Sequence, residues 1–205
     1  MTGDRDRAPS RWAAERSLDA GATYDEKWRQ LAAEGRSIHG EADFVCSFEP
    51  TSVLDAGCGT GRVAIELDRR RIDVVGVDLD PQMLTEARRK APDLTWVDGD
   101  LSTVDLRRTF DVVVAAGNVM IFVQPGSEPA VVANLARHVE PVAGVLVAGF
   151  QLGGAYGLDA YDDDCRSAGL ELVERHATWH GEPFQAAGRA ADYAVSVHRR
   201  AGPGT

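Results

Sequence analysis

The sequence predicts an α/β fold in which a doubly wound, mostly parallel sheet of seven strands ends in a C-terminal antiparallel hairpin. From residue 52 onward, short runs rich in β-branched residues alternate with helical patterns, which is typical of a parallel sheet. The length of 205 residues suits one domain with its own core. Three alternating glycines follow the first predicted strand, at the edge where such sheets bind ligands.

The first part of the chain is polar, and we expect it to form a helical cap over residues 1–48. Helical patterns cover three stretches of the cap, residues 11–18, 24–33 and 38–48. Tyr24 and Trp28 lie one turn apart in the second of these helices and therefore share a face. We interpret this aromatic face as a lid over the site, with simple packing of the cap on the sheet as the alternative.

The core is expected to span residues 49–200, with a flexible tail at 201–205. Five parallel strands are predicted from β-branched runs, at residues 53–56, 72–78, 94–97, 110–116 and 145–150. Four helices are predicted between and after them, at residues 62–70, 81–91, 128–139 and 158–168. Asp80 is expected to cap the second of these helices, because Pro81 suits a first helical turn.

Two closing strands are predicted at residues 170–179 and 191–199. The link between them, at residues 181–188, is too short for the helical crossover that parallel neighbours need. We therefore expect these two strands to form an antiparallel pair.

The composition excludes several kinds of partner. A formal net charge of −10 would repel a polyanion, so no nucleic-acid partner is expected. No apolar run approaches the roughly 20 residues of a membrane helix, and the first residues carry charges where a secretory signal needs an apolar stretch. A cytoplasmic protein without a membrane partner is expected. Cys46, Cys58 and Cys165 are spaced too widely to indicate a disulfide framework or a metal pair.

The most informative segment is residues 53–61, where a buried type of strand leads into Gly57, Gly59 and Gly61 and then into a helix. Glycine permits backbone conformations closed to other residues and lets the chain approach a ligand closely. A plain tight turn needs one glycine at most, so these three are candidate ligand-binding residues. Residues 59–64 also satisfy the G-x-G-x-x-A pattern of nicotinamide proteins, so the glycines alone do not identify the ligand.

Acidic residues at the ends of three predicted strands help to identify the ligand. Asp55 lies inside the first strand, where a carboxylate needs hydrogen bonds or a cation and would repel a diphosphate. Asp78 ends the second strand and can accept both ribose hydroxyls, as in nicotinamide proteins. Asp100 follows the third strand and can accept from an adenine amino group. An acidic site suits S-adenosylmethionine, which carries an ammonium and a sulfonium group.

With these residues, the stretch from about 50 to 150 resembles the class I S-adenosylmethionine-dependent methyltransferase family, especially its small stand-alone members. The resemblance implies a Rossmann-like fold in which the glycine loop holds the methionine part of the donor. It also implies that Asp78 holds the ribose and that Asp100 and Leu101 hold the adenine. The closing hairpin is similar to the last hairpin of the family.

The resemblance suggests further donor-binding residues. Leu79 and Met83 are in positions similar to family residues that pack on the adenine, with a core role as the alternative for Met83. Ala116 lies in the segment where the family places residues that face the transferred methyl group. Tyr24 of the cap is another candidate, because an aromatic face attracts a sulfonium.

The segments expected to face the methyl acceptor lack the sequence motifs of several known classes of methyltransferase. Residues 116–119 read Ala-Gly-Asn-Val instead of the Asn/Asp-Pro-Pro-Tyr stretch of adenine and glutamine methylases, and no cysteine follows a proline as in cytosine-carbon enzymes. The acids that hold magnesium in catechol-type enzymes are absent at Gly117-Asn118 and Gln151-Leu152. The resemblance therefore implies a small-molecule acceptor and no metal. Asn118 is a candidate to orient the acceptor, with a turn asparagine bonded to its own backbone as the alternative.

No catalytic base is assigned, because a sulfonium is a strong electrophile and in-line displacement asks mainly for positioning. The predicted function is methyl transfer from S-adenosylmethionine to a small molecule, with S-adenosylhomocysteine as product. Two alternatives stay open. One is a non-catalytic S-adenosylmethionine-binding domain, and the other is a nicotinamide-dependent oxidoreductase, which Asp55 and Asp100 disfavour.

Overall fold

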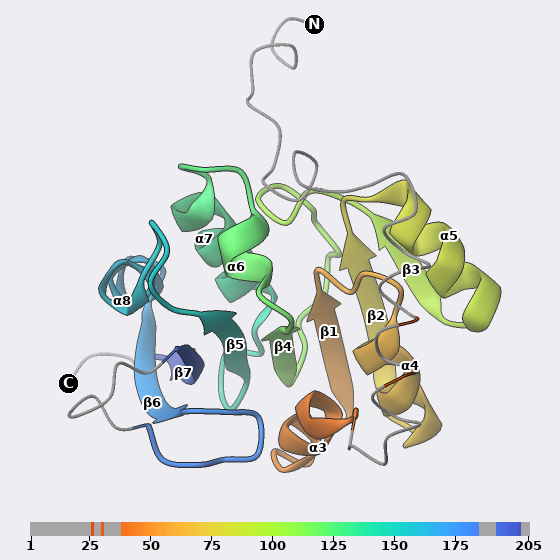
Figure 1. The fold of residues 1–205 in the computed structure, drawn as a ribbon, viewed down its shortest axis with the longest axis horizontal. Helices are drawn as coiled ribbons and strands as arrows, with labels where there is room; N and C mark the ends of the chain where they lie inside the picture. The colour runs from red at the N-terminus through yellow and green to blue at the C-terminus, as the bar shows by residue number, and fades with distance from the viewer. Residues whose placement is uncertain (1–25, 27–29, 31–37, 185–191, 202–205) are drawn as a thin grey trace, which may run out of the picture.

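Seven strands form one mixed sheet in the order β3-β2-β1-β4-β5-β7-β6 (Figure 1). The computed structural model describes residues 26, 30, 38–184 and 192–201. The strands are β1 (Ser52–Ala56), β2 (Asp73–Asp78), β3 (Thr95–Asp98), β4 (Val112–Ala115), β5 (Val145–Gln151), β6 (Leu170–His176) and β7 (Tyr193–Arg200).

The strand pairing confirms the predicted topology. β1 pairs in parallel with β2 and β4, β2 with β3, and β4 with β5. β7 pairs antiparallel with both β5 and β6, so the closing hairpin inserts its second strand next to β5. The order of the strands reverses between β1 and β4, and open α/β sheets bind ligands at the carboxyl ends of the strands beside such a point.

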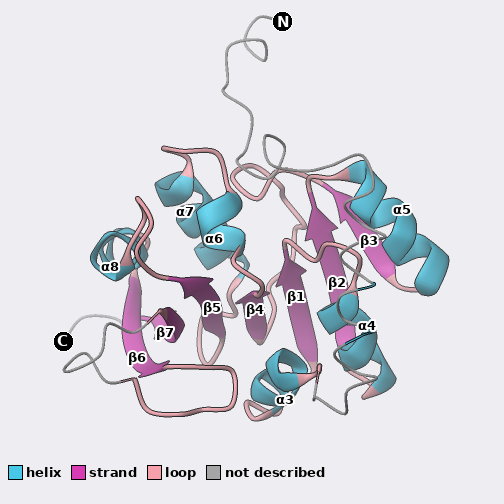
Figure 2. Ribbon diagram, in the orientation of Figure 1, coloured by secondary structure: helices cyan, strands magenta, loops and turns pink. Residues whose placement is uncertain are grey.

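Helices connect most of the strands and cover both faces of the sheet (Figure 2). They are α3 (Gly40–Cys46), α4 (Arg62–Arg69), α5 (Pro81–Lys90), α6 (Val119–Phe122), α7 (Glu128–His138) and α8 (Leu158–Ser167). α3, α4 and α5 share one buried cluster with the sheet, and α6, α7 and α8 share the other. In the part of the chain that is described, no helix is long and apolar enough to cross a membrane.

Two strands, β4 and β6, are each three residues shorter than the sequence predicts. β4 begins at Val112, because Phe110 forms an isolated parallel bridge with Val139 after α7. β6 ends before Trp179, because the chain turns and brings that side chain against β5. There the indole Nε1 of Trp179 donates to the hydroxyl oxygen of Tyr193 at 3.0 Å.

The sequence does not predict α6, because a run of four apolar residues shows no helical period. Only the last cap helix is described, as α3, and it is shorter than predicted. The predicted cap helix at residues 11–18 lies outside the described residues, and so does the one at 24–33 except for Glu26 and Gln30. Tyr24, Trp28 and most of the predicted tail also lie outside them.

The indole of Trp96 in β3 packs against β2 and the glycine loop. Trp96 is 9% exposed, and its Nε1 donates to the carbonyl oxygen of Ala91 at 2.8 Å. A Cβ added at Gly76 in β2 would lie 2.4 Å from this ring, and a Cβ at Gly61 would also lie 2.4 Å from it. Glycine is required at both positions, because the indole occupies the space that a side chain would need.

We expect Gly76→Ala to lower the free energy of unfolding by about 1–3 kcal/mol, since the buried indole is held by its hydrogen bond and cannot move aside. The melting temperature should fall by about 2–12 °C. Gly154→Ala is the control, because a Cβ there meets no atom within 4 Å. Urea and thermal unfolding measure both variants, and equal stability of the two would contradict this account of Trp96.

Candidate functional site

A cavity of about 440 Å³ lies at the carboxyl ends of β1, β2 and β4. Of the donor-binding candidates from the sequence, nine line it: Asp55, Gly57, Gly59, Asp78, Leu79, Met83, Asp100, Leu101 and Ala116. Gly61 is not among the lining residues, and Tyr24 lies outside the described residues. The topology therefore gathers at one cavity residues that are up to 61 positions apart, between Asp55 and Ala116.

The glycine loop leaves β1 and folds back onto the end of β2. The backbone N–H groups of Gly57 and Cys58 both donate to the carbonyl oxygen of Val77, at 2.8 and 3.0 Å. Gly57 and Gly59 have φ angles of 76° and 55°, in the left-handed region that favours glycine. These bonds place the loop across the mouth of the β1–β2 pair.

The three glycines have different surroundings. A Cβ at Gly57 would lie 2.6 Å from Cγ2 of Val119 in α6, so α6 packs directly on the loop. A Cβ at Gly61 would meet Trp96. A Cβ at Gly59 would meet nothing within 4 Å, and Gly59 lines the cavity. Gly59 is therefore the position where bare backbone faces open space that a ligand can fill.

Asp55 supplies a buried carboxylate at the base of the cavity. It is 2% exposed, and its Oδ2 accepts from the backbone N–H of Ala64 in the first turn of α4 at 3.1 Å. Burial raises the pKa of Asp55 to about 7, whereas the Ala64 bond and the charge of Arg62 lower it. The nearby charges of Asp78 and Glu41 raise it further. The site thus holds an acid that ionises more readily once a cation binds beside it.

Asp78 joins the glycine loop to β2 and α5. Its Oδ2 accepts from the N–H of Gly59 and its Oδ1 from the N–H of Asp80, both at 2.8 Å. Burial raises the pKa of Asp78, and these backbone bonds oppose that effect. A carboxylate has about four lone-pair positions, so its oxygens can also accept from a ligand. The sequence indicates a binding role for Asp78 but not its bond to the loop.

The segment after β3 is held by its own side chain and by α7. Oδ1 of Asp100 accepts from the N–H and the hydroxyl of Ser102, at 2.8 and 2.7 Å. The buried Nδ2 of Asn134 donates to the carbonyl oxygens of Leu101 and Val104, at 3.0 and 2.8 Å. Asn134 therefore positions Asp100 and Leu101, which the sequence alone does not indicate because the residues are more than 30 positions apart.

Asn118 lies on the side of the cavity formed by β4 and α6. Its Oδ1 accepts from the N–H of Gln151 at 2.8 Å, and its own N–H donates to the carbonyl oxygen of Gly149 at 3.2 Å. The side chain thus bonds to the end of β5 rather than to its own backbone, and Asn118 also lines the cavity. Gln124 and Ser127 are further polar residues of the lining, and none of the described lining residues is a histidine.

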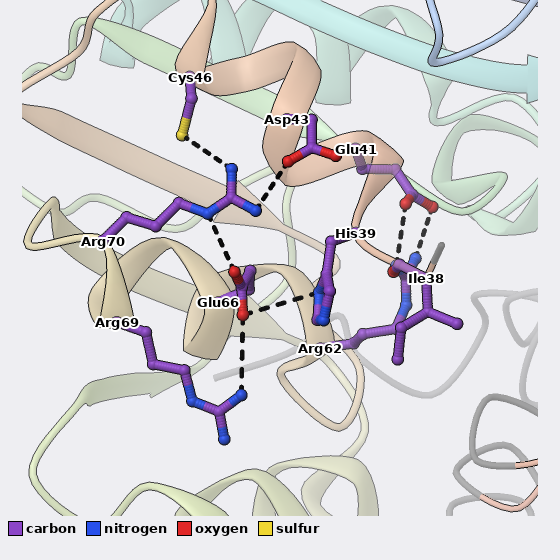
Figure 3. Close-up of polar contacts among 9 residues, drawn as sticks. All are labelled: Ile38, His39, Glu41, Asp43, Cys46, Arg62, Glu66, Arg69 and Arg70. Atoms are coloured by element: carbon purple, nitrogen blue, oxygen red, sulfur yellow. Dashed lines mark hydrogen bonds and ion pairs between the residues drawn. The ribbon is translucent and has the colours of Figure 1, made fainter. Parts of the chain in front are cut away.

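Arg62 and Glu41 form a pair at the rim that the sequence analysis did not identify (Figure 3). Arg62 begins α4 directly after the third glycine and lines the cavity, while Glu41 comes from α3. The position of an arginine immediately after the glycine loop could have drawn attention to it. Across the described part of the chain, no group of three or more His, Cys, Asp or Glu residues is placed to hold a metal ion.

Residues 53–142 match a family model described as a methyltransferase domain. The structure is similar to a crystal structure of a TehB-like S-adenosylmethionine-dependent methyltransferase from Corynebacterium glutamicum, with a TM-score of 0.82 and 34% identity. That similarity covers 90% of this chain and 100% of the other.

Curated relatives match over shorter parts. The chain is 36% identical to dTDP-3-amino-3,4,6-trideoxy-alpha-D-glucopyranose N,N-dimethyltransferase of Streptomyces venezuelae, over 60% of this chain and 52% of the relative. It is 38% identical to magnesium-protoporphyrin O-methyltransferase of Rhodobacter capsulatus, over 36% of this chain and 34% of the relative. The chain thus spans about half, or less, of the length of these relatives.

The raised pKa of Asp55 predicts a specific pH dependence of stability. The folded-state pKa of about 7 exceeds the ordinary value of 3.8. The contribution of Asp55 to the unfolding free energy is therefore fully present below pH 3.8 and is lost as the pH rises through 7. Asp55→Asn removes this loss while an amide oxygen still accepts from Ala64. Between pH 5 and pH 8, the unaltered protein should lose about 2–3 kcal/mol more unfolding free energy than the variant.

Urea unfolding at the two pH values measures this difference, with the exposed Asp93→Asn variant as the control for removing one charge. Equal pH dependence of Asp55→Asn and the unaltered protein would show that burial of Asp55 does not have this effect.

Proposed function

Because this chain belongs to the class I S-adenosylmethionine-dependent methyltransferase family, we propose that it transfers a methyl group from S-adenosylmethionine to a small-molecule acceptor. The observation that supports the proposal most directly is the cavity beside the reversal of strand order between β1 and β4. The glycine loop, Asp55, Asp78 and Asp100 all line this cavity. The names of the two curated relatives describe methylation of an amino sugar nucleotide and of a magnesium porphyrin, which supports a small-molecule acceptor.

The residues present fit this donor. Gly59 leaves room for close approach of the ligand, and Asp78 can accept from ribose hydroxyls while it stays bonded to the loop. The carboxylate of Asp100, which Ser102 holds, is the group that we assign to the adenine amino group. Met83 is 3% exposed and Leu79 is 53% exposed, so Met83 forms part of the cavity wall while Leu79 can close over the adenine.

When bound, S-adenosylmethionine supplies a methyl group on a positively charged sulfur, which an acceptor atom displaces in line. The chain's own contribution is positioning and charge, since Asp55 and Asp78 favour a cationic ligand and α6 covers the loop. Asn118 and the neutral Gln124 and Ser127 also line the cavity and can orient an uncharged acceptor. The described lining therefore supports a reaction that depends on alignment.

The first test is ligand stabilisation. S-adenosylhomocysteine at about 100 times its dissociation constant should add roughly 2.7 kcal/mol to the unfolding free energy, or about 5–10 °C to the melting temperature. NADH should give no shift. Thermal melts with each compound decide between the two ligand classes, and a shift with NADH alone would refute the methyltransferase proposal.

Asp78→Ala should weaken donor binding about 10- to 150-fold, because charge-assisted bonds to the ribose are lost and Gly59 loses its partner. The matched control is Asp73→Ala, which removes an acid from the other end of β2, where it pairs with Arg108 at 2.7 Å. Titration calorimetry with S-adenosylhomocysteine measures both. Unchanged affinity in folded Asp78→Ala protein would place the ribose elsewhere.

A further inference from the structure

If the chain binds S-adenosylmethionine, as the proposed function requires, the charges at the amino-acid end of this donor must be balanced by residues of the cavity. That end carries an ammonium and a carboxylate on one carbon, so its site needs an acid and a cation side by side. Asp55, Asp78 and Asp100 would all repel the carboxylate. Among the described residues that line the cavity, Arg62 carries the one positive charge.

Arg62 is held in a defined orientation. Its Nη1 donates to Oε2 of Glu41 at 2.9 Å and to the carbonyl oxygen of Ile38 at 2.6 Å, and its Nη2 donates to Oε1 of Glu41 at 2.5 Å (Figure 3). Both side chains are 11% exposed. A bidentate, largely desolvated pair of this kind fixes the plane of the guanidinium as well as its position.

Asp55 lines the same cavity as Arg62, and the positive charge of Arg62 acts on the carboxyl group of Asp55. Asp55 is the next-to-last residue of β1 and Arg62 begins α4, so the glycine loop lies between them in the sequence. An amino-acid head group placed against this loop would have Asp55 available for its ammonium and Arg62 for its carboxylate. We propose that Arg62 binds the carboxylate of the methyl donor, with Glu41 and the Ile38 carbonyl as the groups that position it.

The pair could instead serve only to attach α3 to α4. Arg70 does that, because it bonds to Glu66 and Cys46 and forms an ion pair with Asp43 at 2.7 Å (Figure 3). Arg70 does not line the cavity. It therefore provides a matched control, since it bridges the same helices as Arg62 without reaching the ligand.

The experiment compares two ligands that differ only in the carboxylate, S-adenosylhomocysteine and its decarboxylated analogue S-adenosyl-3-thiopropylamine. Titration calorimetry gives the ratio of their dissociation constants in each protein. The unaltered protein should bind S-adenosylhomocysteine about 10- to 150-fold more tightly than the analogue. Arg62→Met should bring this ratio close to one, whereas Arg70→Met should leave it unchanged while lowering the melting temperature.

Arg62→Met leaves the buried Glu41 carboxylate without this partner. The uncompensated charge can prevent folding, and it can also repel the carboxylate of the ligand. The double variant Glu41→Gln with Arg62→Met removes that charge and should give the same ratio close to one. Binding of S-adenosylhomocysteine with a ratio unaltered by these changes would overturn the assignment of Arg62 alone. Absence of S-adenosylhomocysteine binding to the unaltered protein would instead contradict the proposed function.

Discussion

The attachment of the glycine loop to the end of β2 is the constraint on which the rest of the site depends. Two N–H groups, of Gly57 and Cys58, bond to the single carbonyl of Val77, and the N–H of Gly59 bonds to Asp78. These bonds satisfy the backbone N–H groups at the point where the chain leaves the buried strand β1 and no longer pairs with neighbouring strands. Because the loop is held there, α4 begins above β1 and its first turn meets the carboxylate of Asp55.

The loop is also packed from two sides by residues distant in sequence. Val119 of α6 contacts the loop at Gly57, and the indole of Trp96 contacts it at Gly61. Two of the three glycines, Gly57 and Gly61, are therefore required by packing within the protein, whereas at Gly59 the backbone borders open space in the cavity. A glycine pattern that suggests a single role at the sequence level thus combines close packing with ligand approach.

Periodicity and turn chemistry predicted the sheet, the antiparallel hairpin and most helices, because those elements depend on which faces are buried. Local pattern could not predict α6, whose four apolar residues fit a strand equally well, or the early end of β6, where Trp179 leaves the strand to pack on Gly149. The acids were found because strand ends converge at one edge of a parallel sheet. Asn134 and Glu41 were missed, since their partners are 33 and 21 residues away and depend on tertiary packing.

Stability and binding are opposed at Asp55, because a buried carboxylate near Asp78 and Glu41 costs free energy that a cationic ligand would offset. Arg62 differs from Asp55 in that a residue of the protein neutralises its charge before any ligand binds. Its charge is already compensated, but the compensating group comes from α3, outside the segment that contains the glycine loop. The position of α3 and the charge balance of the cavity are therefore linked, and a shift of α3 would change the orientation of the one cation in the described lining. The glycine loop and the strand ends alone do not reveal this link between α3 and Arg62, because Glu41 lies outside both.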